Sequence, residues 1–163
     1  MESIPIDIIN LFFVYLNTKD LIWASRTCKQ WRYIFKKYIG KYKLDLRQWR
    51  NKITDQSLKN LKGAHTINLS YCNQITNRGL EHLKGVHTIY LYNCNQITDQ
   101  GLEHLKGVHT IYLYYCNQIT NQGLEILRNV NPTAMVTSIL TSWALEEKTL
   151  MDFQDIQISI FSV

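Results

Sequence analysis

Histidine pairs recur along the chain at a spacing that could place zinc ligands on one surface. His82 and His87, like His104 and His109, have four residues between them. A zinc site needs four converging ligands, or three and a water. A fifth histidine, His65, precedes His87 by the same interval that separates His87 from His109. We therefore interpret the pairs as a result of duplication and expect no metal site. A metal-dependent enzyme, which a chelator would inhibit, is kept as an alternative.

Cysteines could supply nucleophiles, metal ligands or disulfides. Cys72, Cys94 and Cys116 are equally spaced at the interval of the histidines, and Cys28 stands alone. This spacing marks a repeat position rather than a disulfide framework or a CxxC metal motif. We expect reduced thiols and a cytoplasmic or nuclear protein. No phosphate-binding glycine loop or nucleophile elbow accompanies them, so we predict that the chain is not an enzyme and needs no cofactor.

The composition favours a folded chain without a membrane span. The 163 residues are 45% hydrophobic and 19% charged, which is enough for a packed core. No apolar run is long enough for a transmembrane helix, and the N-terminus lacks the basic start and cleavage site of a signal peptide. Most of the 18 lysines and arginines lie between Arg26 and Lys62. We interpret them as a solvated surface and consider nucleic acid an unfavoured partner.

Three nearly identical segments follow one another at residues 65–86, 87–108 and 109–130. Each differs from the next at five of 22 positions, and a diverged copy occupies residues 43–64. A fixed period of this length with an L-x-L core is typical of leucine-rich repeats. Because one repeat cannot bury its own apolar face, stacked repeats must share a core.

Each repeat has the periodicities of a strand and of a short helix. In the second copy, Ile89 and Leu91 alternate with outward residues, and Cys94 follows where the chain turns. Thr98 or Asp99 is expected to cap the helix that follows. The pattern L-x-L-x-x-C-x-x-I-T-D-x-G-L-x-x-L resembles the cysteine-containing class of leucine-rich repeats. The unit is shorter than in that class, so the convex side should carry a minimal helix or a turn.

Tyrosines collect at the outward strand positions, where the copies differ most. In a solenoid these positions line the concave face of the sheet, and exposed tyrosines suit protein recognition. Alternatively, the tyrosines only stabilise adjacent strands. The predicted substrate-binding residues are Asn68, Ser70, Thr88, Tyr90, Tyr92, Tyr112 and Tyr114.

The N-terminal segment 1–40 does not repeat, and it predicts three helices. Pro5 fits a first helical turn, Asn17 or Thr18 can cap a second helix, and Gly40 should end a third. The arrangement of Ile4-Pro5, Leu11-Phe12, Asp20-Leu21 and Cys28-x-x-Trp31 resembles an F-box. In that family the motif binds the adaptor Skp1. The resemblance implies adaptor contacts at Ile4, Pro5, Ile8, Leu11, Phe12, Leu16, Leu21, Cys28 and Trp31, although these residues can instead form the helices' own core.

The expected fold is therefore an α+β chain with an α/β solenoid. An F-box of three helices (1–40) precedes a short leucine-rich-repeat solenoid (41–130) of parallel strands and short helices. Residues 131–163 form a C-terminal cap or a partly disordered tail, in which the segment TAMVTSIL could add a last strand. The combination resembles the substrate receptors of Skp1–cullin–F-box ubiquitin ligases, which implies a protein that is monomeric before assembly. The alternative is an interaction module that captures Skp1 without presenting a substrate.

Overall fold

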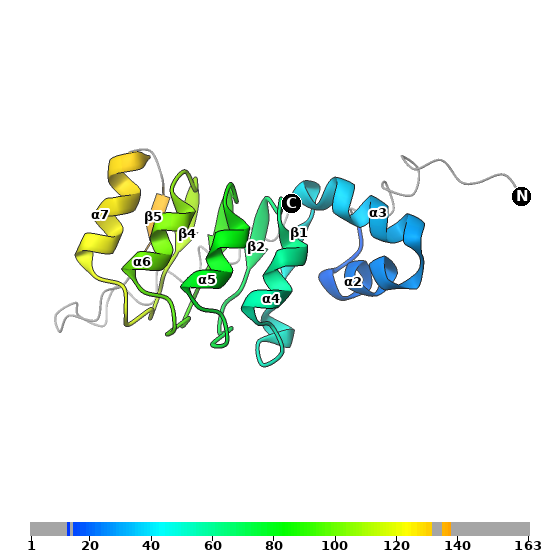
Figure 1. Ribbon diagram of the computed structural model, residues 1–163, viewed down its shortest axis with the longest axis horizontal. Helices are drawn as coiled ribbons and strands as arrows, with labels where there is room; N and C mark the ends of the chain where they lie inside the picture. Colours follow the sequence, from blue (N-terminus) through cyan, green and yellow to red (C-terminus); the bar gives the residue numbers. More distant parts are fainter. Residues whose placement is uncertain (1–12, 14, 132–134, 138–163) are drawn as a thin grey trace, which may run out of the picture.

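Two helices begin the part of the chain that the computed structural model describes, which comprises residues 13, 15–131 and 135–137. Helix α2 (Thr18–Thr27) and helix α3 (Lys29–Tyr38) pack against each other at one end of an elongated molecule (Figure 1). Asn17 caps α2 by accepting a hydrogen bond from the backbone N–H of Asp20, at 3.0 Å, which confirms one of its two expected caps. Gly40 does not stop α3 directly, because the helix tightens into a 3-10 turn at Ile39–Lys41.

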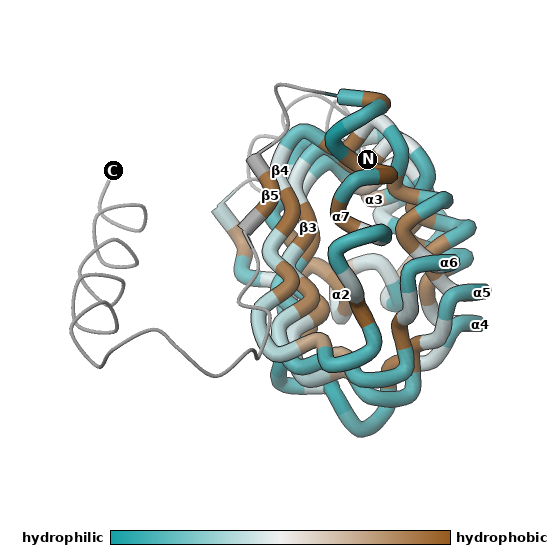
Figure 2. The backbone as a smooth tube through the Cα atoms, turned by 90° about the vertical axis from the view of Figure 1, so that its left-hand side faces the viewer, coloured by the Kyte–Doolittle hydropathy of each residue, from teal (hydrophilic) through white to brown (hydrophobic). Residues whose placement is uncertain are grey.

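The repeats that follow build one layer of strands and one layer of helices (Figures 1 and 2). Five strands lie parallel in chain order, and isoleucine pairs with isoleucine at the centre of β2, β3 and β4. The strands are β1 (Lys43–Asp45), β2 (Thr66–Asn68), β3 (Thr88–Tyr90), β4 (Thr110–Tyr112) and β5 (Met135–Thr137). The helices are α4 (Asp55–Leu58), α5 (Asn77–Leu80), α6 (Asp99–Leu102) and α7 (Asn121–Val130), with 3-10 turns at Arg47–Trp49, Lys59–Leu61, Glu81–Leu83 and Glu103–Leu105.

These elements confirm the minimal helix expected of so short a repeat unit. Gly85 and Gly107 end the convex segments at φ +85° and +92°, a conformation that costs glycine little. The tail adds β5, as its sequence suggested, and the remaining predictions for the tail lie outside the described residues. The strands are shorter than the alternation implied, yet the ladder of backbone hydrogen bonds continues beyond them through Tyr71 N–H to Tyr92 C=O at 2.7 Å.

A single hydrophobic core runs from the helices through all the repeats. Thr18 connects the two parts, because its hydroxyl accepts a hydrogen bond from the N–H of Asp45 at 2.7 Å and lies 3.4 Å from the carbonyl oxygen of Lys43. Phe35 stacks on Tyr42, which is buried between the helices and β1. The helices therefore close the open end of the solenoid, whose first repeat would otherwise expose its core.

Polar side chains connect each repeat to the next on the convex side. Asp99 was a candidate cap for its own helix, but its carboxylate instead accepts hydrogen bonds from the N–H and hydroxyl of Thr120, at 2.8 and 2.6 Å. Asp55 binds Thr76 in the same way. Helix α6 begins at Asp99, so Thr98 occupies the N-cap position, where its side chain makes no capping hydrogen bond. Asp99 is the first residue of the four-residue helix α6, and its carboxylate reaches the threonine of the next repeat.

Candidate protein-interaction site

The tyrosines predicted to bind a substrate do lie together on the side of the sheet away from the helices, which we call the sheet face. Tyr90 and Tyr112 stack with ring centroids 4.4 Å apart and planes 2° apart. Tyr92 and Tyr114 are 6.2 Å apart in the next row along the chain. These four tyrosines, with Asn68 and Thr88, are partly exposed at positions that adjacent strands align.

Ser70 is the exception, and its predicted place on an exposed edge is wrong. Its relative exposure is only 5%, and its backbone N–H donates to Oδ1 of Asn68 at 3.0 Å. Ser70 is equivalent to Tyr92 of the neighbouring repeat. Because a serine side chain is short, the larger side chains around Ser70 cover it.

Two tyrosines of this surface were missed by the alternation rule. Tyr71 and Tyr115 are 42% and 36% exposed, and each ring lies 5.1 Å from the ring of Tyr92. Both have left-handed backbones, at φ 66° and 57°, where a bulky residue costs about 1–2 kcal/mol. The signal in the sequence was the equivalent residue, Asn93, since asparagine tolerates this conformation and marks a turn. Residues that keep a strained backbone and present exposed rings are candidates for function.

The sheet face carries no formal charge over three repeats. The segments 65–76, 87–98 and 109–120 contain no Asp, Glu, Lys or Arg. Burial, together with the neighbouring phenols of Tyr71 and Tyr115, raises the pKa of Tyr92 to about 12. Tyr92 therefore remains neutral at physiological pH. The tyrosines of the sheet face offer hydrogen bonds and aromatic area to a ligand.

The residues predicted to contact an adaptor fall into four groups. Leu21 is 1% exposed and lies in the core, so its predicted contact with an adaptor is not available in the isolated chain. Leu16 and Trp31 are partly buried against the core, with Trp31 edge-on to Phe13 at 5.7 Å. Cys28 is exposed, and its Sγ accepts a hydrogen bond from the N–H of Trp31 at 3.5 Å, which caps α3. The predicted contacts at Ile4, Pro5, Ile8, Leu11 and Phe12 lie outside the described residues.

Comparison with protein families supports both halves of this arrangement. The profile of the F-box domain matches residues 1–42, and that of a leucine-rich repeat matches residues 65–84. The chain therefore carries an F-box domain and a leucine-rich repeat. No curated protein matches the chain. Both families are interaction domains rather than enzymatic families.

The histidines of the repeats form a row rather than a metal site. His65, His87 and His109 stack at 4.4 Å between successive rings along one edge of the sheet. Partial desolvation, then the neighbouring His65 and His109, lower the pKa of His87. Within the described ranges, no three His, Cys, Asp or Glu side chains are arranged to hold a metal ion.

The repeat cysteines are structural. Cys94 and Cys116 are buried. Their Sγ atoms lie 3.2 and 2.8 Å, respectively, from a backbone carbonyl oxygen of the preceding repeat. Burial raises the pKa of Cys72 to about 11 and also raises the pKa of the other two thiols. They are therefore poor nucleophiles at neutral pH. None of the helices in the described part of the chain has the length and apolar character to cross a membrane.

Proposed function

We propose that this protein is a substrate-recognition subunit of a Skp1–cullin–F-box ubiquitin ligase. Its N-terminal helices would bind a Skp1-type adaptor, and its sheet face would bind a protein substrate. The chain itself performs no chemistry in this scheme. Because its cysteines are free thiols, we also propose a reducing compartment, the cytoplasm or nucleus.

The observation that carries this proposal is the continuous core between the helices and the repeats. Phe13, Leu21 and Ile34 belong to the same cluster as the buried residues of every repeat. A substrate on the sheet face would therefore be held at a fixed distance from an adaptor on the helices. Such tethering raises the effective concentration of a substrate lysine near the ligase without any catalytic residue in the receptor.

The chemistry of the sheet face supports a substrate surface that is neutral, polar and partly apolar. Tyr71, Tyr92 and Tyr115 form one contiguous group of rings, beside the stacked pair of Tyr90 and Tyr112. Tyrosine gives contact area and a hydroxyl with little loss of side-chain entropy. A strongly charged substrate segment would lose hydration here without gaining an ion pair.

Co-expression with a Skp1-type adaptor, followed by gel filtration, tests the first half of the proposal. The wild-type chain should elute as a 1:1 complex, and the double variant Pro5→Ala, Leu11→Ala should not. A matched control, Gln30→Ala with Tyr33→Ala, changes two exposed positions of α3 and should keep the complex. A folded wild-type chain that forms no complex would contradict adaptor binding and leave the helices as a solenoid cap.

The second half is tested with Tyr90→Ala, Tyr112→Ala, which removes the stacked pair. Proteins captured in cells by the wild-type complex should be ubiquitinated in the reconstituted ligase, and the variant should keep the adaptor but lose those proteins. Captured proteins that bind through the tyrosines yet receive no ubiquitin would favour the alternative, a competitor that occupies the adaptor without presenting a substrate.

A further inference from the structure

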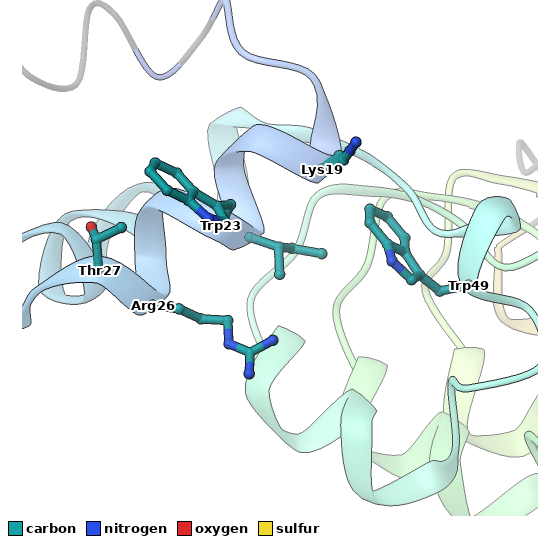
Figure 3. Close-up of a pocket in the computed structure, with 6 residues that line it drawn as sticks. Lys19, Trp23, Arg26, Thr27 and Trp49 are labelled. Carbon is teal, nitrogen blue, oxygen red and sulfur yellow. The ribbon is translucent and has the colours of Figure 1, made fainter.

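A groove lies between α2 and the first repeat, and its lining includes none of the tyrosines of the sheet face. Figure 3 shows the indole rings of Trp23, from α2, and Trp49, from the 3-10 turn Arg47–Trp49, on its two sides. Its volume is about 380 Å³, enough for one or two bulky side chains. Neither tryptophan was assigned a role by the sequence.

The α2 wall of the groove is one stripe of the helix. Lys19, Ile22, Trp23, Arg26 and Thr27 follow the i, i+3, i+4, i+7, i+8 spacing of a single helical face. Ile22 is the aliphatic residue of this stripe. Figure 3 shows the side chains of Lys19 and Arg26 beside the two indoles. Trp23 is 67% exposed. Tryptophan is among the residues that contribute most binding energy when an interface buries them.

Lys19, Arg26 and the two indoles that line the groove can only donate hydrogen bonds. Lys19 and Arg26 have no ion pair among the described residues. The indole N–H groups of Trp23 and Trp49 can only donate, and the Thr27 hydroxyl already donates to the carbonyl oxygen of Ala24 at 2.7 Å. No carboxylate lines the described groove. A ligand must therefore bring acceptors and, to complement the two cations, negative charge.

Among the described residues, the nearby acids make no ion pair with these cations. The carboxylate of Asp20 on the same helix accepts a hydrogen bond from the Asn17 side chain at 2.7 Å, and Asp45 is paired with Arg47. The positive potential at the groove is thus left for a partner, and it would speed the encounter with an acidic segment.

We propose that this groove binds an acidic peptide segment of a partner protein. A bulky apolar side chain of that segment packs on Ile22 between the two indoles, and flanking carboxylates pair with Lys19 and Arg26. The occupant is a peptide rather than a nucleic acid, because a single strand needs a basic track for several phosphates and successive stacking platforms. The site is separate from the sheet face, so it offers this protein a second point of attachment for a substrate or a regulator.

The test selects random peptides displayed on phage against the full-length chain and measures the affinity of the enriched sequences by fluorescence anisotropy. We expect peptides rich in Asp and Glu around a large apolar residue. Trp23→Ala and the pair Lys19→Glu, Arg26→Glu should each weaken binding by about tenfold or more. The pair Lys29→Glu, Lys36→Glu makes the same charge change at exposed positions of α3 and should leave the affinity within about twofold.

Several outcomes would overturn the proposal. Because Lys19, Trp23 and Arg26 are all exposed, each variant should stay folded, and circular dichroism checks this first. Enrichment of basic or uncharged peptides, or equal binding by wild type and the Trp23→Ala variant, would refute an acidic-peptide groove. Binding of a single-stranded oligonucleotide that is lost in the same variants would assign the groove to nucleic acid. Loss of the Skp1-type adaptor in Trp23→Ala would assign it to the adaptor surface.

Discussion

The helical end and the repeats are stabilised in different ways although they share one core. Between repeats each contact is copied: a cysteine thiol to a carbonyl oxygen, an aspartate or asparagine to a threonine, and one imidazole on another. At the helical end each contact occurs once, as in the pairs Phe13–Trp31 and Phe35–Tyr42. The repeats gain stability from neighbours of the same kind, while the helices depend on a single neighbour, the first repeat.

This difference bears on how the two proposed functions, adaptor binding and substrate binding, can be separated. The repeats hold their framework constant, so side chains of the sheet face can vary without loss of packing, as Asn68 and Tyr90 do at equivalent positions. The helical end has no redundancy, and a unit of about forty residues buries too little surface to be stable alone. Its surface can change only where it does not contact the first repeat.

The largest expected loss of stability comes from truncating one core side chain in the repeats and one in the helices. Ile89 and Leu21 are both fully or almost fully buried, so Ile89→Ala and Leu21→Ala should each lower the free energy of unfolding by about 2–5 kcal/mol. Because the core is continuous, urea denaturation followed by circular dichroism should give one transition for both variants. Two separate transitions in the Leu21→Ala variant would show that the helices unfold independently of the repeats.

A smaller loss of stability is expected at the glycine in the first turn of the helix of each full repeat, such as Gly101 in α6. A Cβ at Gly101 would lie 2.5 Å from Oδ1 of Asn77, the atom that accepts the N–H of Thr98. Gly101→Ala should therefore cost about 1–3 kcal/mol of stability through this crowding. Gly107→Ala is the control: a Cβ there has open space, and only the left-handed backbone, about 1 kcal/mol, opposes it.

A double-mutant cycle separates crowding from other causes at this position. In an Asn77→Ala background, Gly101→Ala should cost clearly less than in the wild type, as measured by chemical denaturation. Equal costs in both backgrounds would mean that the contact between neighbouring repeats is not what demands glycine. The diverged first copy carries Ser57 at this position, which is consistent because no repeat precedes it.

The hydrogen bond between Thr18 of α2 and Asp45 of β1 connects the two regions and can be tested by mutation. Thr18→Val keeps the side-chain shape but leaves the N–H of Asp45 without its acceptor, so the protein should lose about 1–3 kcal/mol. Thr27→Val removes a hydroxyl that bonds only within α2, and thermal unfolding should show a much smaller change. Similar losses for both variants would argue that Thr18 does not hold the helices on β1.

The smallest expected effect is a pH dependence that belongs to the repeats. His87 has a lowered pKa in the folded protein, so below about pH 6.5 the unfolded state binds more protons than the folded state. The stability is fully present above that pH and decreases as the pH falls through the lower folded pKa. Denaturation midpoints of wild type and His87→Gln, compared between neutral and mildly acidic pH, should show a steeper loss in the wild type. Parallel profiles would contradict the coupling within the histidine row.

The periodic residues made most of the repeat fold predictable, since a shift of one repeat length identifies Ile67, Ile89 and Ile111 as equivalent and buried. The alternation rule failed at Tyr71 and Tyr115 because the chain leaves the extended conformation there. The role of Asp99 was also missed, since one repeat read alone cannot reveal a bond to the next. At the helical end no repeat existed to compare, and the Trp23–Trp49 groove unites residues from two separate segments.

Hydrogen–deuterium exchange of the full-length chain, with and without a Skp1-type adaptor, tests the division of labour most directly. The account predicts slower exchange over residues 15–38 when the adaptor is bound, and unchanged exchange over residues 88–92 and 110–115. Protection of the tyrosine segments instead, or no protection anywhere at saturating adaptor, would contradict the claim that the helices bind the ligase while the sheet face stays free for a substrate.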